Sequence, residues 1–251
     1  MALVEPGAVI GEDTSIDAYA IVRSGAHVGQ NCKIHPHTLI ESGARIGNQV
    51  EVYPFACIGG RPQHLKHHGR DALALVGDRT ILREGVTIHV GTDLGSNTTI
   101  IGNDCYLMVG CHVAHDCILG HHVIMANHVH LAGHVQVGNH TTIGGLTAVV
   151  QHCHIGPSCY IGGASIIRKD LAPFLAGKGN PFHVQGINVI GLRRQNINEE
   201  HIRLLRHAFR AVFKGGKTLK EALMEMEALT ACDELHVFRD FIRQSKLGLE
   251  R

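Results

Sequence analysis

Residues 111–134, CHVAHDCILGHHVIMANHVHLAGH, contain seven histidines and two cysteines. Imidazole and thiolate are common zinc ligands, and histidine is also the side chain best suited to move a proton near neutral pH. The segment could therefore bind a metal ion or supply a general base. A disulfide or a structural zinc site needs paired cysteines, and the sequence contains no C-x-x-C motif. What these histidines do depends on the elements that position them.

Those elements follow a repeat of six residues. Aliphatic side chains recur at every sixth position over residues 10–58 and 76–88 and, one residue out of phase, over 101–167. Gly often follows the aliphatic residue, as in Ile10-Gly11, and it suits a corner because it tolerates positive φ. Six residues make one short strand and one corner, three corners close a triangular coil, and stacked coils pair about 4.8 Å apart. The repeat predicts a mainly β fold, a parallel β-helix of hexapeptide repeats.

Six of the eight cysteines occupy one position of this repeat, two residues before the aliphatic side chain. Elsewhere this position often holds alanine or threonine, so the thiols are expected to be small buried side chains that pack in the core. The six are Cys32, Cys105, Cys111, Cys117, Cys153 and Cys159. The N-terminus has no basic segment followed by a long apolar run, so we expect no signal peptide, reduced thiols and a cytoplasmic location.

The charge balance and hydropathy exclude some partners. The 251 residues include 23 Lys+Arg and 22 Asp+Glu, a formal net charge of +1. That balance gives no whole-chain attraction to nucleic acid or to acidic membranes. No stretch approaches 18 uninterrupted apolar residues, so no integral membrane segment is expected.

The repeat also predicts two domains. Residues 1–190 are expected to form the β-helix, with projecting loops near 59–75 and 89–100, where the spacing is too long for a simple corner. Residues 191–251 are expected to form a C-terminal domain of three α-helices, because their apolar side chains follow helical spacing. This domain should pack on the end of the prism and on a neighbouring subunit.

The repeat assigns each histidine a position. Three pairs lie 18 residues apart and should stack on successive coils: His112 with His130, His122 with His140, and His134 with His152. His115 occupies a different position, two residues after Val113 and beside Asp116. For most of the histidines, ladder stacking on the outside of the prism is therefore the favoured interpretation over metal binding.

Several segments, taken with the hexapeptide prism and the helical tail, resemble the UDP-N-acetylglucosamine acyltransferase family. They are CHVAHDC, QHLKHHG, GDRTILREGVTIHVGT, LAGH, GGLTAVVQ and GINVIGLRR. The resemblance spans nearly the whole chain and implies a left-handed coil and a homotrimer with active sites between prisms. It implies transfer of a 3-hydroxyacyl chain from acyl carrier protein to the glucosamine 3-hydroxyl of UDP-N-acetylglucosamine. This cofactor-independent reaction opens lipid A biosynthesis.

The resemblance also implies a role for each catalytic residue. His115, in AHDC, matches the general base that activates the sugar hydroxyl. The backbone N–H of Gly133 matches the oxyanion donor for the thioester intermediate. Asp116 would hold the tautomer of His115, although neighbouring side chains in a strand point to opposite faces, so the two are not expected to meet.

The substrate contacts are carried over motif by motif. Residues expected to contact the nucleotide sugar or to line its cleft are Lys66, Gln63, His112, His134, Gln151, Asn188 and Arg194. Of these, Lys66 would approach the phosphate, and Asn188 and Arg194 would hold the UDP portion. Gly163 matches the position that sets acyl-chain length. Basic residues of the helical tail could attract the acidic carrier protein or simply be solvated: Arg203, Arg206, Arg210, Lys214, Lys217 and Lys220.

Three departures from the family pattern leave the acceptor open. His64 stands where a carboxylate is usual, Ile190 where some members have an acidic residue, and Gln195 where a second arginine often follows. A 3-amino UDP-sugar is therefore the alternative acceptor.

Other classes remain as alternatives. The later N-acyltransferase of the same pathway has an extra N-terminal uridine-binding domain, for which a repeat beginning at residue 10 is expected to leave no room. A zinc-dependent carbonic anhydrase on this fold uses a His-x4-His pair, which the sequence lacks, so no metal site is expected. The last alternative is a β-helix with a structural or carrier-binding role only.

Overall fold

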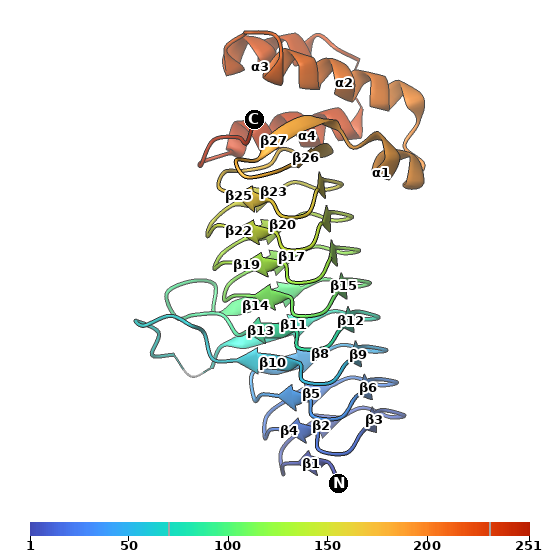
Figure 1. The fold of residues 1–251 in the computed structure, drawn as a ribbon, viewed down its shortest axis with the longest axis vertical. Coiled ribbons are helices and arrows are strands. Elements are labelled where there is room, and N and C mark those ends of the chain that lie inside the picture. The colour runs from blue at the N-terminus through green and yellow to red at the C-terminus, as the bar shows by residue number, and fades with distance from the viewer. Residues whose placement is uncertain (70, 231) are drawn as a thin grey trace.

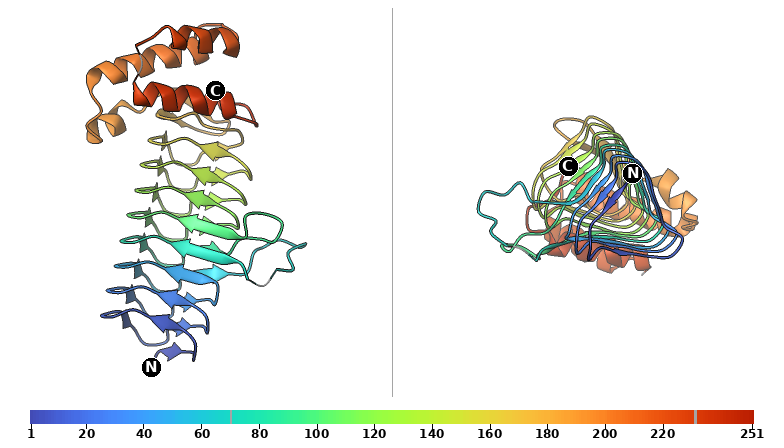
Figure 2. Two further views of the ribbon diagram at one scale, coloured as in Figure 1. Left: turned by 180° about the vertical axis from the view of Figure 1, so that it is seen from behind. Right: turned by 90° about the horizontal axis from the view of Figure 1, so that it is seen from below.

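The computed structural model describes residues 1–69, 71–230 and 232–251. Arg70, within the predicted loop 59–75, and Ala231, within the predicted helical domain, lie outside the described residues. Short parallel strands form a three-sided prism, and helices cover its C-terminal end (Figure 1). Seen along its axis, the prism is triangular, as a hexapeptide repeat requires (Figure 2). The prediction of a left-handed parallel β-helix followed by α-helices is confirmed.

Each side of the prism is one sheet, and we name the three sides faces A, B and C. Face A has nine strands: β1 (Leu3–Val4), β4 (Ile21–Val22), β7 (Leu39–Ile40), β10 (Cys57–Gly60), β13 (Thr87–His89), β16 (His112–Val113), β19 (His130–Leu131), β22 (Ala148–Val149) and β25 (Ile166–Ile167). Face B has eight: β2 (Val9–Ile10), β5 (His27–Val28), β8 (Ala44–Ile46), β11 (Leu73–Val76), β14 (Thr98–Ile101), β17 (Ile118–Leu119), β20 (Gln136–Val137) and β23 (His154–Ile155). Face C has ten: β3 (Ser15–Ile16), β6 (Lys33–Ile34), β9 (Glu51–Val52), β12 (Ile81–Leu82), β15 (Tyr106–Leu107), β18 (Ile124–Met125), β21 (Thr142–Ile143), β24 (Tyr160–Ile161), β26 (Leu175–Lys178) and β27 (His183–Ile187).

The aliphatic side chain of each repeat points into the prism and forms its core. Val113 pairs in register with Leu131 of the next coil, and both are fully buried. Only Ile10 and Ile16, in the first coils, are partly exposed among the 24 predicted core positions. Each buried aliphatic side chain contributes about 1.5–3 kcal/mol of transfer free energy. The stacked aliphatic side chains therefore make a large favourable contribution to folding.

The cysteines of the repeat lie inside the prism as predicted. All eight cysteines are free thiols. Burial raises the pKa of Cys117 to about 12, and its Sγ–H donates to the carbonyl of Ala132 at 3.1 Å. Such a thiol is inert as a nucleophile or a metal ligand.

The glycines that follow the aliphatic residues have a different cause from the predicted one. Most of them do not adopt positive φ; a non-glycine residue two positions further on does, such as Asp13 (φ 57°) or Asn31 (φ 56°). Instead, a Cβ on Gly29 would lie 2.4 Å from the carbonyl oxygen of Gly47 in the next coil. Glycine is needed here because two coils approach too closely for a side chain.

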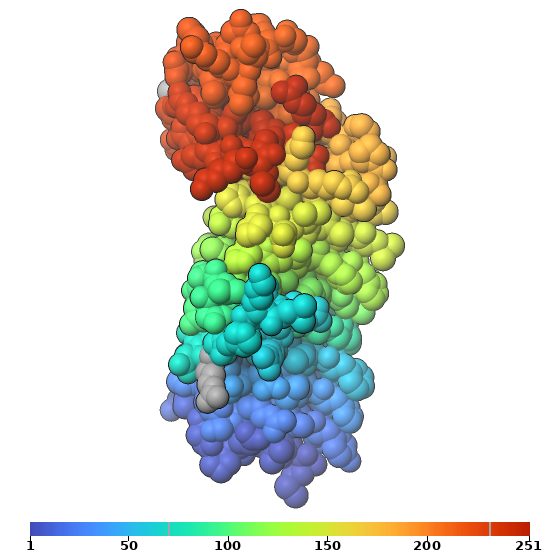
Figure 3. Space-filling view, turned by 90° about the vertical axis from the view of Figure 1, so that its left-hand side faces the viewer, coloured from blue at the N-terminus to red at the C-terminus, as the bar shows by residue number. Residues whose placement is uncertain are grey.

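Both projecting loops leave the prism at the same edge. We name the three edges by the faces that meet there: A/B, B/C and C/A. Loop 61–72 joins β10 to β11 and loop 90–97 joins β13 to β14, so both lie on the A/B edge. They lie side by side about half-way along the prism (Figure 3). The coil resumes after each loop, because β11 still pairs with β8 and β14.

In the described ranges, four helices follow the prism: α1 (Val189–Arg194), α2 (Glu199–Phe213), α3 (Leu219–Glu227) and α4 (Asp233–Gln244). The three expected helices are α2 to α4, and α3 begins with a capping box between Thr218 and Glu221. The short helix α1 was not predicted, and the expected boundary after residue 190 falls inside it. Ser245 Oγ donates to Asp170 at 2.8 Å and fixes the end of α4 to the prism. None of the helices in the described ranges is both long and apolar enough to cross a membrane.

Candidate active site

His115 lies on the A/B edge between β16 and β17, beside the two projecting loops. Its side chain is 11% exposed, and its Nδ1 lies 2.8 Å from Oδ2 of Asp116. This contact was not expected between neighbours in a strand. It forms because Asp116 is at the corner, with φ 60°, which turns its side chain back toward His115. The pair is a histidine–carboxylate dyad at the surface of the prism.

Loop 90–97 holds the carboxylate of this dyad. Asp116 accepts hydrogen bonds from the N–H and Oγ1 of Thr92 and from the N–H and Oγ of Ser96 at 2.6–3.2 Å. Its own N–H donates to Oγ1 of Thr99 at 2.8 Å. Burial alone would raise the pKa of Asp116, but hydrogen bonds from Thr92, His115 and Ser96 outweigh it and lower the pKa to about 2. Asp116 is therefore an anion over the whole physiological pH range.

Sequence reasoning missed these supporting residues. The only available signal was the polar run in HVGTDLGSNTTI, whose small donors could have indicated a bound anion. Gly95 belongs to the same set, since a Cβ there would lie 2.5 Å from the Asp116 carboxylate. Only glycine lets the loop close over the carboxylate.

Because Asp116 occupies Nδ1, the other ring nitrogen of His115 is the one free to react. The Nδ1–H donates to the carboxylate, which leaves a lone pair on Nε2. Gly133, on the next coil, faces this side of the ring: a Cβ on Gly133 would lie 2.8 Å from Nε2. The carbonyl of Gly133 accepts from the N–H of His152 at 3.1 Å. Among the described residues, no acceptor is found for the N–H of Gly133, which is the donor predicted for an oxyanion.

Other histidines surround the dyad. His134 lies edge-on to His115 with ring centroids 5.1 Å apart, and His152 stacks on His134 at 4.5 Å, as the 18-residue spacing predicts. The ring of His64, in loop 61–72, also lies edge-on to His115, with ring centroids 5.2 Å apart. Nδ1 of His64 is buried, and within the described part of the chain it has no hydrogen-bond partner.

A second histidine pair lies on face A, next to the dyad. His112 accepts from or donates to Oγ1 of Thr87 at 2.7 Å, and His89 lies edge-on to it at 4.7 Å. Burial, together with His89 and His130, lowers the pKa of His112 to about 4. His112 is therefore neutral near pH 7 and can serve as a hydrogen-bond donor or acceptor. His89 was not predicted as a site residue; burial lowers its pKa too.

The geometry of the dyad does not suit a metal ion. Ligand atoms of His115, Asp116 and His134 lie within 4.8 Å of one another. However, both oxygens of Asp116 already accept hydrogen bonds from Thr92 or Ser96, and Nδ1 of His115 is bonded to the carboxylate. A zinc ion would have to displace these bonds. A second cluster of potential metal ligands consists of His201, Cys232 and Glu234, and in it Nδ1 of His201 on α2 lies 2.9 Å from Oε2 of Glu234 on α4.

The other predicted site residues lie on all three edges of the prism. The A/B edge carries His134 and Gln151, together with the exposed Gln63 and Lys66 of loop 61–72. Asn188 caps α1 and donates from Nδ2 to the carbonyl of Ser158, on the B/C edge.

Arg194 is exposed at the end of the same helix, α1, and Gly163 is exposed on the C/A edge. One chain therefore does not bring these residues together. Of the three sequence departures, His64 touches His115, Gln195 accepts from Oγ of Ser158 at 2.9 Å, and Ile190 is exposed.

The six basic residues predicted to attract a carrier protein are all exposed on α2, α3 and the turn between them. Lys217 forms an ion pair with Glu225.

Two family models match the chain. The model described as "Udp N-acetylglucosamine O-acyltransferase; Domain 2" matches residues 170–250, and the model "Bacterial transferase hexapeptide (six repeats)" matches 7–42 and 98–133. An acyl-[acyl-carrier-protein]–UDP-N-acetylglucosamine O-acyltransferase from Paraburkholderia phymatum is 38% identical over 100% of this chain and 97% of its own length.

Solved structures give the same result. LpxA from Acinetobacter baumannii is 37% identical, covers 100% of this chain and 98% of its own, and superposes with a TM-score of 0.96. LpxA from Bacteroides fragilis, a UDP-N-acetylglucosamine acyltransferase, is 35% identical with the same coverage and a TM-score of 0.97.

Proposed function

The chain belongs to the UDP-N-acetylglucosamine O-acyltransferase family, and on that basis we propose that it transfers a 3-hydroxyacyl group from acyl carrier protein to the 3-hydroxyl of UDP-N-acetylglucosamine. The reaction would be the first step of lipid A biosynthesis, and it would take place in the cytoplasm. The observation that carries the proposal in this chain is the His115–Asp116 dyad beside the exposed loops.

In the proposed reaction His115 is the general base. Nε2 takes the proton of the sugar 3-hydroxyl as its oxygen attacks the thioester carbonyl carbon. The new C–O bond forms a tetrahedral oxyanion. When this collapses, the C–S bond breaks, and the leaving thiolate of the carrier takes the proton from the His115 imidazolium. Asp116, an anion held by four hydrogen bonds from loop 90–97, orients the ring and stabilises its protonated form.

The N–H of Gly133 would stabilise the oxyanion. Gly133 lies directly against the His115 ring, so a donor and the base face the same small volume. A backbone N–H that is already fixed costs no reorganisation during the reaction.

We propose that each complete site is shared between subunits of a homotrimer. The base lies on the A/B edge, whereas Asn188 and Arg194 lie at α1 on the B/C edge and Gly163 lies on the C/A edge. Within one rigid prism these edges cannot meet. In a closed ring of copies, the A/B edge of one chain can face another edge of the next. His115 and Lys66 of one copy would then act with Asn188 and Arg194 of its neighbour.

The proposed acyl-chain site follows from the same arrangement. Gly163 lies between β24 and β25, nearly three coils above His115, which is about 13 Å along the axis at ~4.8 Å per coil. An added Cβ on Gly163 would lie 3.1 Å from the carbonyl oxygen of Gly145 and 3.7 Å from its nitrogen, so the backbone of the previous coil borders this position. An acyl chain extending along the prism from His115 of one copy would end near Gly163 of the neighbouring copy.

The alternatives gain no support from the named relatives. A 3-amino acceptor would rest on the three sequence departures, of which His64 touches His115. A carbonic anhydrase would need a metal ion at atoms of His115 and Asp116 that already take part in hydrogen bonds. One assay separates all three: the purified protein is incubated with acyl carrier proteins of several chain lengths and either UDP-sugar, with and without a chelator.

Mass spectrometry should show an O-acylated UDP-N-acetylglucosamine whose formation survives the chelator and is lost in His115→Ala. Near-normal turnover by that variant would refute the assignment.

A further inference from the structure

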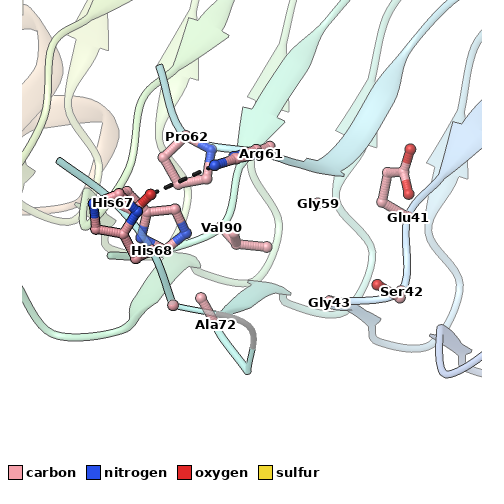
Figure 4. Close-up of a pocket in the computed structure, with 11 residues that line it drawn as sticks. Glu41, Ser42, Gly43, Gly59, Arg61, Pro62, His67, His68, Ala72 and Val90 are labelled. Atoms are coloured by element: carbon pink, nitrogen blue, oxygen red, sulfur yellow. Dashed lines mark hydrogen bonds between the residues drawn. The ribbon is translucent and has the colours of Figure 1, made fainter. Parts of the chain in front are cut away.

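The side chain of His67, in the projecting loop 61–72, points inward. Lys66 is exposed and Leu65 fully so, whereas His67 is 3% exposed. Figure 4 shows His67 next to His68, with the guanidinium of Arg61 directed at the His67 carbonyl, 3.5 Å away. A pocket of about 460 Å³ is lined by both loops and by neighbouring residues of the prism such as Glu41 and Gly43. The catalytic scheme above gives His67 no role.

The imidazole of His67 is hydrogen-bonded to loop 90–97. Nδ1 of His67 lies 2.8 Å from Oδ1 of Asp93, and this bond lowers the pKa of the Asp93 carboxyl. The two loops also pack closely, because a Cβ on Gly69 would lie 3.1 Å from both His67 Cε1 and Asp93 Cβ. A buried histidine bonded to a carboxylate on another segment fixes the distance between the two segments.

Asp93 directly follows Thr92, which holds the carboxylate of Asp116. Loop 61–72 also contacts the dyad directly, because the His64 ring lies against His115. Within this loop, the His67 N–H donates to the His64 carbonyl at 3.0 Å. The contacts therefore close a ring, from His67 through Asp93, Thr92, Asp116, His115 and His64 back to His67.

We propose that His67 and Asp93 are positioning residues, which fix loop 61–72 relative to the His115–Asp116 dyad before substrate arrives. The part of this inference that concerns substrate rests on the proposed function. Lys66 immediately precedes His67, so a fixed His67 also fixes the point from which Lys66 reaches the sugar phosphate. Binding then does not need to order the loop, which lowers KM for the nucleotide sugar.

The first test needs no substrate. In limited trypsin digestion of the full chain, cleavage after Lys66, identified by mass, reports opening of the loop. His67→Phe keeps a buried ring but has no donor, and Asp93→Ala removes the acceptor. Each should speed this cleavage about tenfold, whereas Asp93→Asn keeps an oxygen acceptor and should stay within about threefold of the wild type. His68→Ala, at the exposed neighbour, is the matched control and should change nothing.

The second test uses steady-state kinetics. His67→Phe and Asp93→Ala should each raise KM for UDP-N-acetylglucosamine about tenfold, with kcat and the KM for acyl carrier protein within about threefold. Because the two side chains act as one pair, the double variant should be no worse than either single variant. Asp93→Asn should again be close to the wild type.

The two tests separate the possible failures. A wild type without acyl transfer would contradict the proposed function, while faster cleavage in His67→Phe would still support the fixed loop. If His67→Phe is cleaved like the wild type, or if the double variant shows the sum of the two single effects, the pair only packs and the inference is wrong.

Discussion

Gly133 lies so close to His115 that a Cβ on the glycine would be 2.5 Å from Cε1 of the imidazole. Gly133→Ala should therefore push the ring away from the reacting atoms while the coil still forms. We expect kcat to fall about 100-fold, because a displacement near 1 Å costs that much in a positioned base. Steady-state kinetics measures the loss, and circular dichroism checks the fold.

The matched control is Gly186→Ala. Among the described residues, no heavy atom lies within 4 Å of a Cβ added to Gly186, so this change adds the same methyl group without a clash. Equal losses in both variants would mean that the methyl group acts through general stability and not through His115.

Asp116→Asn tests the tautomer of the base. An amide can turn its NH2 toward Nδ1, and Nε2 would then carry the hydrogen and could not accept the proton of the sugar. We expect kcat to fall between about 100-fold and 10,000-fold, with a small change in KM. An activity within threefold of the wild type would show that the dyad does not set the tautomer.

The same carboxyl should make stability depend on acidity. The pKa of Asp116 in the folded protein is about 2, below its ordinary value of 3.8. Its contribution to the free energy of unfolding is therefore complete above pH 3.8 and is lost as the pH falls toward 2. The shift corresponds to about 2 kcal/mol. Urea unfolding at fixed protein concentration should show the wild type losing more stability than Asp116→Asn over this interval; parallel curves would contradict the assignment.

His112 should give a pH dependence in another range. Its pKa is about 4 in the folded protein against an ordinary 6.5, so between these values the unfolded chain binds the extra proton and stability rises with pH. The slope from this group is at most about 1.4 kcal/mol per pH unit. His112→Asn removes this titrating group, so the free energy of unfolding of the variant should change less between pH 6.5 and 4 than that of the wild type. His37→Asn, at an exposed histidine, is the control and should behave like the wild type.

A shared site predicts complementation between two inactive variants. His115→Ala and Arg194→Ala alter different edges, so some sites in a mixed trimer combine an intact His115 with an intact Arg194 from the next copy. Random assembly should restore about a quarter of the wild-type rate. Mixing without subunit exchange should restore none. If exchanged mixtures stay inactive while size measurement shows mixed trimers, the site is not shared in this way.

The period of the sequence was sufficient to predict the prism. Core positions such as Val113 and Leu131 follow from the six-residue spacing alone, because each strand contributes one inward side chain. The reason for the glycines was wrong, since the close approach of Gly29 to Gly47 depends on how coils stack and not on local φ. The short helix α1 lies below the length at which apolar spacing can be recognised.

The dyad shows where sequence reasoning stopped. His115 could be singled out by its motif, but its bond to Asp116 depends on positive φ at a non-glycine corner, which spacing does not reveal. Thr92, Ser96 and Gly95 reach Asp116 from about 20 residues away, through a loop whose path no periodic pattern describes. The supporting residues of a site on an irregular loop therefore need coordinates.

Both loops leave and re-enter the prism at the A/B edge. After them, β11 and β14 pair in parallel with each other, and β11 also pairs with β8, so the sheet of face B continues without interruption. Extra residues at that corner leave the pitch of the coil and its aliphatic core unchanged. The lengths of these loops can thus diverge between related chains at little cost in stability. This corner is where natural variation, or an engineer grafting a foreign loop, can change the residues beside the His115–Asp116 dyad while the rest of the scaffold stays fixed.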